Sequence, residues 1–224
     1  MTLPFDMKFL DAGSLAELLE LQNVIAANLP CPEVFILHDE EYLREVFCRD
    51  RSAIGVRIGE MLIAFSIIRI PGISAENLGR DISLPEEELT RLAHLQAAAV
   101  HPAYRGHGLQ RKLTFAHLDV IEELGYEHAC CTVSPKNPVS LGNYLSCGLA
   151  IEGLRQKRHG WWRFILHKDI PQANQLEIEQ KRVAISDIAG QLDLLSKGFK
   201  GFRISPQCEG KQAQVFYAKF KSSF

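Results

Sequence analysis

The chain has 224 residues, of which 46% are hydrophobic and 23% charged, and its formal net charge is −2. This length and composition predict one large domain, with or without a small appendage. The lack of a basic excess argues against nucleic acid as the main partner.

The first part of the chain alternates between strand and helix patterns. In chain order we predict a strand over 7–12, helices over 14–29 and 39–48, and strands over 53–58 and 61–70. The last two strands form a hairpin that turns at Gly59-Glu60. The polar residues 72–90 are expected to form a loop near the entrance of the site, with one helical turn starting after Pro85.

The next part repeats the alternation. We predict a strand over 92–100, a helix over 108–124, a strand over 128–133, a helix over 137–147 and a hairpin of strands 149–157 and 161–167 around His159-Gly160. This order predicts an α/β or α+β domain over residues 1–170, in which helices flank a mixed central sheet.

After Asp169 the character of the chain changes. We expect a polar linker over 171–179, an amphipathic segment over 184–195 and a strand pair over 198–205 and 213–221. About 50 residues are too few for a comfortable independent domain. Residues 171–224 are therefore predicted to be a small αββ appendage packed on the main domain, where they complete a pocket, cover a sheet edge or form a homodimer.

The apolar runs and the cysteines bear on the compartment. The longest apolar run, 61–70, is about half the roughly 20 residues that a membrane-spanning helix needs, and no basic segment followed by an apolar one opens the chain. The six cysteines form no C-x-x-C pair, and Cys130 and Cys131 are predicted to point to opposite faces of a strand. We therefore expect a cytoplasmic protein with reduced thiols and no membrane partner.

The segment from Val100 to Arg111 carries the clearest chemistry. A strand pattern enters it, an amphipathic helix leaves it, and the loop between them holds two glycines and several positive side chains. Such a loop binds phosphate through backbone N–H groups and the positive end of the helix dipole. It fails the dinucleotide template, because Arg111 stands where a third glycine belongs, and it also lacks the Gly-Lys-Ser/Thr of a P-loop.

The loop resembles the acyl-coenzyme A loop of the GNAT N-acetyltransferase superfamily, whose signature Gln/Arg-x-x-Gly-x-Gly/Ala follows a strand that ends in apolar-x-Pro. Arg105 and Gly108 match this signature, and Gln110 stands where Gly or Ala is usual. Downstream, the family pattern Asn-x-x-Ala/Ser-x-x-x-Tyr-x-x-x-Gly-Phe is matched by Asn137, Ser140, Tyr144, Gly148 and Leu149. Together the two motifs cover about residues 92–149, and the order of elements fits the family through residue 168.

The resemblance implies that an acetyl group passes from acetyl-CoA to a primary amine by direct transfer in a ternary complex. The residues that it assigns to the cofactor are Ala98, Ala99, Val100, Arg105, Gly106, His107, Gly108, Leu109, Gln110, Arg111, Asn137 and Tyr144. Some of them have a structural alternative: the alanines are small residues packed in a sheet, the arginines lie on a solvated helix face, and Asn137 caps a helix.

Two residues are candidates for proton transfer. Tyr144 would protonate the departing thiolate, since a phenol with a pKa near 10 suits that leaving group, and the alternative is an aromatic packing residue. Its spacing of seven residues from Asn137, about two helical turns, places both on one groove. His94 would be the general base, on one strand face with Gln96 and Ala98, and the alternative is a structural histidine. An acidic stretch, Glu86-Glu87-Glu88, would attract a cationic substrate or form a solvated turn.

Other functions remain open at this point. No His, Cys, Asp or Glu residues have metal-ligand spacing in the sequence, so we predict no metal. The alternatives to the enzyme are a GNAT-like acyl-CoA-binding sensor or interaction module, and a nucleotide-binding protein without acyl transfer. The acceptor, a small-molecule or protein amine, cannot be read from the sequence.

Overall fold

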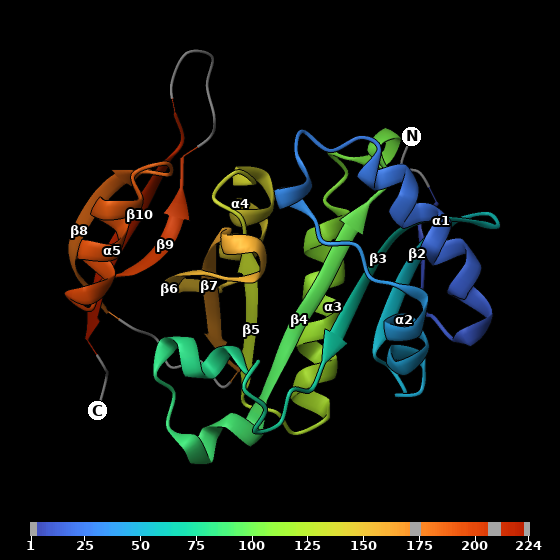
Figure 1. Cartoon of the computed structure of the whole chain (residues 1–224), viewed down its shortest axis with the longest axis horizontal. Coiled ribbons are helices and arrows are strands. Elements are labelled where there is room, and N and C mark those ends of the chain that lie inside the picture. Colours follow the sequence, from blue (N-terminus) through green and yellow to red (C-terminus); the bar gives the residue numbers. More distant parts are fainter. Residues whose placement is uncertain (1–3, 171–175, 206–211, 222–224) are drawn as a thin grey trace. The chain divides into compact units, whose positions relative to one another are not determined.

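A computed structural model describes residues 4–170, 176–205 and 212–221 (Figure 1). Its tertiary contacts divide the chain into two compact units. The first unit comprises residues up to 70 together with 93–124, and the second comprises 71–92 together with 125 onward.

The first unit is an antiparallel sheet with helices on both faces. Its strands follow the order β1 (Asp6–Phe9), β2 (Ala53–Ile58), β3 (Met61–Arg69) and β4 (Leu92–Val100). Helices α1 (Leu15–Ala26) and α2 (Glu40–Phe47) bury their apolar faces with Phe65, Ile67, Ala97 and Ala99 on one side of the sheet. Helix α3 (Leu109–Glu123) covers the other side through Leu109 and Leu113.

The strands of the second unit follow the order β5 (His128–Val133), β7 (Trp162–Asp169), β6 (Ala150–Gln156), β9 (Lys200–Ile204), β10 (Gln214–Lys221) and β8 (Leu176–Ala184). Helix α4 (Pro138–Ser146) contacts β9, and α5 (Ile188–Ser196) contacts β6. The 3₁₀ helices η3 (Leu78–Ile82) and η4 (Glu86–Arg91) belong to this unit, and η3 packs on β5, β6 and β7.

The predicted order of elements is confirmed through β7, with shifts at the ends. The first strand lies at Asp6–Phe9 rather than 7–12, because residues 12–14 form a 3₁₀ turn, η1 (Ala12–Ser14). Gly59 turns the β2–β3 hairpin with φ 56°, as predicted, and η6 (Arg158–Gly160) lies at the turn of the β6–β7 hairpin. Two other short 3₁₀ helices, η2 (Pro32–Val34) and η5 (Pro102–Tyr104), lie in connections.

The polar segment 72–90 is more ordered than a plain loop. It forms η3 and η4, with Pro85 immediately before the predicted helical turn. Leu78 and Leu89 are buried, and Leu78 packs with Leu92, Cys130 and Ile165. These few apolar side chains, spaced irregularly among charges, anchor the segment without giving the periodicity that predicts an element.

The C-terminal segment differs from the αββ prediction by one strand. Residues 176–179 of the predicted linker begin β8, so the segment reads strand, helix, strand, strand; residues 171–175 lie outside the described part. Because β8 is an edge strand, it carries exposed charges such as Lys181 and Arg182, and these mask its strand pattern. Helix α5 begins at Ile188, after the N-cap Asp187, and not at 184.

Strand β9 joins this segment to the rest of the second unit by pairing Gly201 with Ile151 of β6. A glycine suits this pairing, since a Cβ at Gly201 would lie 3.0 Å from the Cβ atom of Ile151, closer than nearly all real Cβ contacts. The predicted boundary between a main domain of residues 1–170 and an appendage of residues 171–224 stays a prediction.

The described cysteines are free thiols. Cys130, Cys131 and Cys147 are buried, and Cys208 lies outside the described residues. Cys130 packs with Leu78, whereas Cys131 lies near Cys147 at the end of α4, which agrees with opposite faces of β5. Among the described residues, no helix combines the length and apolar character needed to cross a membrane.

Candidate functional site

Strand β4 leads into the candidate site and contains a β-bulge. Val100 lies opposite Ala64 and Ala98 opposite Ser66, but the register with β3 shifts beyond Ile67, so that Gln96 is an extra residue on β4. A bulge of this kind interrupts the alternation of side chains along the strand.

The bulge changes the environment of the proposed base. His94 lies opposite Arg69, three residues along β3 from Ser66, which faces Ala98. His94 and Ala98 therefore point to opposite faces of the sheet, and the expectation that they share one face is wrong. His94 is also buried, with 3% of its surface exposed.

Beyond the bulge, burial alternates along the strand. Ala97 and Ala99 are buried in the core beneath α1 and α2, whereas Ala98 and Val100 are partly exposed. The side chain of Ala99 is therefore packed in the core, which is the structural alternative to a role in cofactor binding.

The loop after β4 is shaped by two glycines. Gly106 has φ 85° and Gly108 has φ 71°, in the left-handed region that residues with a Cβ rarely adopt. Gly108 is the N-cap of α3 and has no side chain with which to cap it. The side chains of Asp39, Asn137 and Asp187 accept capping hydrogen bonds at the starts of α2, α4 and α5, whereas α1 begins without one, like α3. The start of α3 therefore presents the positive end of the helix dipole without a side-chain cap.

Positive side chains surround this helix end. The Nε atom of Arg105 donates to the Val100 carbonyl oxygen at 3.4 Å, and the guanidinium of Arg111 lies beside Gly108. His107 and Lys112 both pack on the ring of Phe5, at 5.8 Å and 5.5 Å from its centroid. The first turn of α3 carries no acidic residue, so the local charge is cationic.

The downstream motif lies in the second unit, on α4 and the residues that flank it. The Oδ1 atom of Asn137 accepts a hydrogen bond from the Ser140 backbone N–H at 3.0 Å, so its helix-capping role is confirmed. Tyr144 lies seven residues later on the same helix and is buried, with 5% of its surface exposed. The cofactor contact of Asn137 and the acid role of Tyr144 stay predictions.

Comparisons with known proteins identify the fold. No protein-family model matches the chain, and no curated protein matches it in sequence. Many solved structures do match, among them several N-acetyltransferases and one described as GCN5-related, from Kribbella flavida.

Three of the matches illustrate the similarity. The ribosomal-protein-S18-alanine N-acetyltransferase of Escherichia coli is 18% identical, with a TM-score of 0.54 over 76% of this chain and 96% of that one. YncA of Salmonella typhimurium, described with its cofactor acetyl-CoA, is 14% identical, with a TM-score of 0.59 over 78% and 99%. The PaiA N-acetyltransferase of Thermoplasma acidophilum, in complex with coenzyme A, is 17% identical, with a TM-score of 0.52 over 75% and 99%.

This chain has the GNAT fold.

The GNAT fold confirms the predicted fold class. Within it, the first unit brings together Ala98–Val100 and the loop 105–111, and the second brings together Asn137 and Tyr144. The sequence motifs thus fall on the strand–loop–helix and strand–helix elements for which they were predicted.

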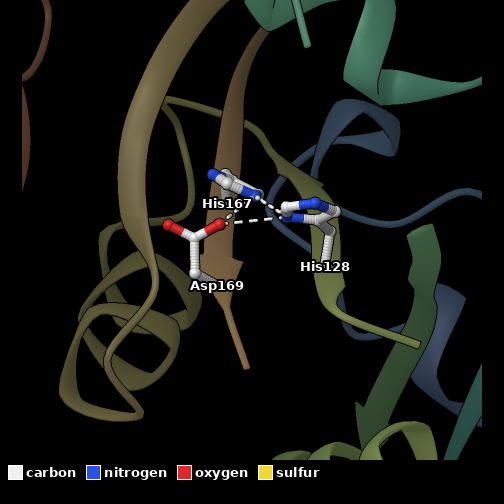
Figure 2. A group of neighbouring side chains, drawn as sticks. All are labelled: His128, His167 and Asp169. Atoms are coloured by element: carbon white, nitrogen blue, oxygen red, sulfur yellow. Dashed lines mark hydrogen bonds and ion pairs between the residues drawn. The ribbon is translucent and has the colours of Figure 1, made fainter. Parts of the chain in front are cut away.

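One group of polar residues was missed by sequence reasoning. His128, His167 and Asp169 converge in the second unit, at the ends of β5 and β7 (Figure 2). His128 is 39 and 41 residues from its two partners, so no local spacing signals the cluster. Only the pairing of β5 with β7 brings them together.

A buried carboxylate lies beside this cluster. The Oε1 atom of Glu152 is 3.1 Å from the Nδ1 atom of His167 and accepts from the Nζ atom of Lys200 at 2.7 Å. Burial opposes ionisation of Glu152, but the hydrogen bonds and charges of His167 and Lys200 outweigh it and lower its pKa below the usual value. Glu152 is therefore an ionised acceptor at neutral pH.

Proposed function

We propose that this protein is an N-acetyltransferase that transfers an acetyl group from acetyl-CoA to a primary amine. The observation that carries the proposal is the start of α3, where two left-handed glycines lead into a helix end without a side-chain cap, directly after β4 of a GNAT fold. The bound acetyl-CoA of YncA and coenzyme A of PaiA support the choice of donor.

The residues of the loop fit a pyrophosphate. Backbone N–H groups in the first turn of α3 have the direction and partial charge that suit a bound anion. A Cβ at Gly106 or Gly108 would strain the loop, because both φ angles are positive. Arg105 and Arg111 add charge at the same helix end. In the proposal, residues 105–111 hold the pyrophosphate and Ala98–Val100 line the acyl arm.

The proposed transfer is direct. The amine nitrogen attacks the thioester carbonyl carbon, and a backbone N–H near Val100 stabilises the developing oxyanion. The carbon–sulfur bond then breaks, and the coenzyme A thiolate takes a proton from the phenol of Tyr144. The attacking amine releases its own proton to solvent or to His94. The bulge at Gln96, which turns His94 to the face opposite Ala98, favours solvent.

That same bulge favours a second function. Because the strongest candidate base lies buried on the other face of β4, the second candidate is a sensor or interaction module that binds acyl-CoA without turnover.

The E. coli relative acts on a protein alanine, so a protein amine joins small-molecule amines as an acceptor class for the enzyme.

A thiol-release assay tests the proposal. The full chain is incubated with acetyl-CoA and a library of polyamines, amino acids, amino sugars, aminoglycosides and peptides with free N-termini, and free coenzyme A is measured. We expect release that depends on one amine class, with a matching product 42 mass units heavier, about the mass that acetyl adds in place of a proton. Acetyl-CoA binding without release for any amine would instead support the sensor, and the absence of binding would contradict both.

A further inference from the structure

The cluster of His128, His167 and Asp169 is built on one face of the second unit's sheet. His128 opens β5, and Asp169 ends β7 directly opposite it in the register. His167 lies two residues before Asp169 and therefore shares its face. Figure 2 shows the two rings and the carboxylate pointing toward one another. Because regular strands fix all three backbone positions, the cluster is preformed.

Three electron-pair donors meet within this cluster. The Nδ1 atom of His128 lies 3.1 Å from the Nε2 atom of His167 and 3.0 Å from the Oδ1 atom of Asp169, and the last two atoms are 3.4 Å apart. Atoms at these separations share a point about 2 Å from each, which is the length of zinc–nitrogen and zinc–oxygen bonds.

The outer nitrogen of each ring meets a carboxylate. The Nε2 atom of His128 lies 3.1 Å from Glu88, and the Nδ1 atom of His167 lies 3.1 Å from Glu152. A carboxylate accepts an N–H, so the outer nitrogen of each ring has an acceptor within hydrogen-bond distance. A ring that donates from its outer nitrogen presents the lone pair of its inner nitrogen. This carboxylate–histidine arrangement is the one that orients imidazole ligands toward a metal ion.

The three inner atoms converge on one point. A proton on the Nδ1 atom of His128 would have to be shared between His167 and Asp169, which lie 3.1 Å and 3.0 Å away. A divalent ion would instead accept a lone pair from each of the three atoms at once.

We propose that His128, His167 and Asp169 bind a divalent transition-metal ion, with Zn²⁺ as the ion of choice. Two imidazoles and one carboxylate suit Zn²⁺ and its first-row neighbours, whereas Mg²⁺ and Ca²⁺ prefer oxygen ligands alone. The side chain of Asp169 is 44% exposed and that of His167 only 5%, so the ion reaches the site from the Asp169 side. This inference is independent of the proposed acetyl transfer.

The ion would fasten one end of the second unit. It would join β5 to β7, and through Glu88 and Glu152 it would also engage η4 and β6. An ion that binds only the folded state raises the free energy of unfolding as its concentration rises above its Kd. Added Zn²⁺ is therefore expected to raise the melting temperature of the chain.

Calorimetric titration of the metal-stripped, tag-free chain with Zn²⁺ tests the site. We expect one ion per chain, with a Co²⁺ spectrum of nitrogen and oxygen ligands that lacks the sulfur-to-cobalt charge-transfer band of a cysteine site. Asp169→Asn, which keeps the shape of the side chain, should weaken binding at least tenfold. Glu152→Gln should weaken it by about 10-fold to 100-fold, because it acts through the ligand His167.

The matched control is His159→Asn, which removes an exposed histidine from the η6 turn, outside the cluster. His159 has φ 64°, a conformation that Asn tolerates, and the variant should bind Zn²⁺ like the wild type. Circular dichroism of each variant verifies the fold. The proposal is overturned if the wild type binds no Zn²⁺, if its Co²⁺ spectrum shows thiolate ligation, or if the folded Asp169→Asn variant binds as tightly as the wild type.

Discussion

Among single residues, the buried His117 has an environment with a direct consequence for stability. It lies on α3 with none of its surface exposed, and its Nδ1 atom is 2.9 Å from the Oγ atom of Ser66. Burial lowers the pKa of His117 to about 3, because the charged ring would lose its hydration. The Nε2 atom has no hydrogen-bond partner among the described residues. His117 is thus a neutral core residue.

This predicts a loss of stability in acid. The unfolded chain protonates His117 near pH 6.5, while the folded chain resists until about pH 3. Between these values the unfolded state holds the extra proton, so the free energy of unfolding falls as pH falls, by up to about 1.4 kcal/mol per pH unit. Denaturant unfolding of His117→Asn between pH 7 and 4 should show a shallower slope than the wild type. A slope that changes no more than in His159→Asn would show that His117 does not cause the acid sensitivity.

Tyr144 carries the prediction about chemistry at this scale. If its phenol protonates the thiolate, Tyr144→Phe should lower kcat about 100-fold or more while the Kd for acetyl-CoA changes little. The measurement compares turnover with an active amine and calorimetric binding, each across pH. Tyr126→Phe, a partly exposed tyrosine between α3 and β5, serves as control. Unchanged turnover of Tyr144→Phe across the pH range would refute the acid assignment.

Residue-level expectations succeeded where a local pattern was enough. The cap at Asn137 follows from an Asn placed before a helical pattern, and the turn at Gly59 from a glycine between two strands. The sheet face toward which His94 points could not be predicted, because it depends on the bulge at Gln96. Nothing in an apolar run of residues marks which of them has no partner on the neighbouring strand.

Among the elements, the start of α3 carries the proposed function, and glycine geometry tests it. Gly108→Ala places a Cβ at φ 71° and should cost roughly 1–2 kcal/mol of stability. It should also weaken acetyl-CoA binding several-fold, since the strained loop carries the anion site. Gly125 follows the other end of α3 with φ 81° and open space around it, so Gly125→Ala is the matched control.

The two variants separate stability from binding. Both should lower the melting temperature to a similar extent, but only Gly108→Ala should raise the Kd for acetyl-CoA in calorimetry. Equal affinities in the two variants would show that the glycine loop does not hold the cofactor.

The elements differ in how well the sequence predicts them. Buried strands and amphipathic helices are periodic, and they emerged in the correct order through β7. Strand β8 did not, because an edge strand covered with charges resembles a polar linker. The His128, His167 and Asp169 cluster also escaped prediction, because the partners of a sheet strand are set by topology rather than by sequence spacing.

For the whole molecule, the fold follows from structural similarity and the proposed function from one loop. Alignment with N-acetyltransferases at 12–18% identity establishes the GNAT fold, whereas the donor is inferred from the α3 loop and the acceptor is open. The measurement that decides the central claim is therefore one of donor binding, with nucleotides that share phosphate chemistry as competitors.

Isothermal titration calorimetry of the full chain with acetyl-CoA, ATP and NAD makes that measurement. If the Arg105–Arg111 loop is an acyl-CoA site, acetyl-CoA should bind with one molecule per chain and at least about tenfold more tightly than either nucleotide, a difference of about 1.4 kcal/mol or more. Tighter binding of ATP or NAD, or no binding of acetyl-CoA by the folded chain, would contradict the account.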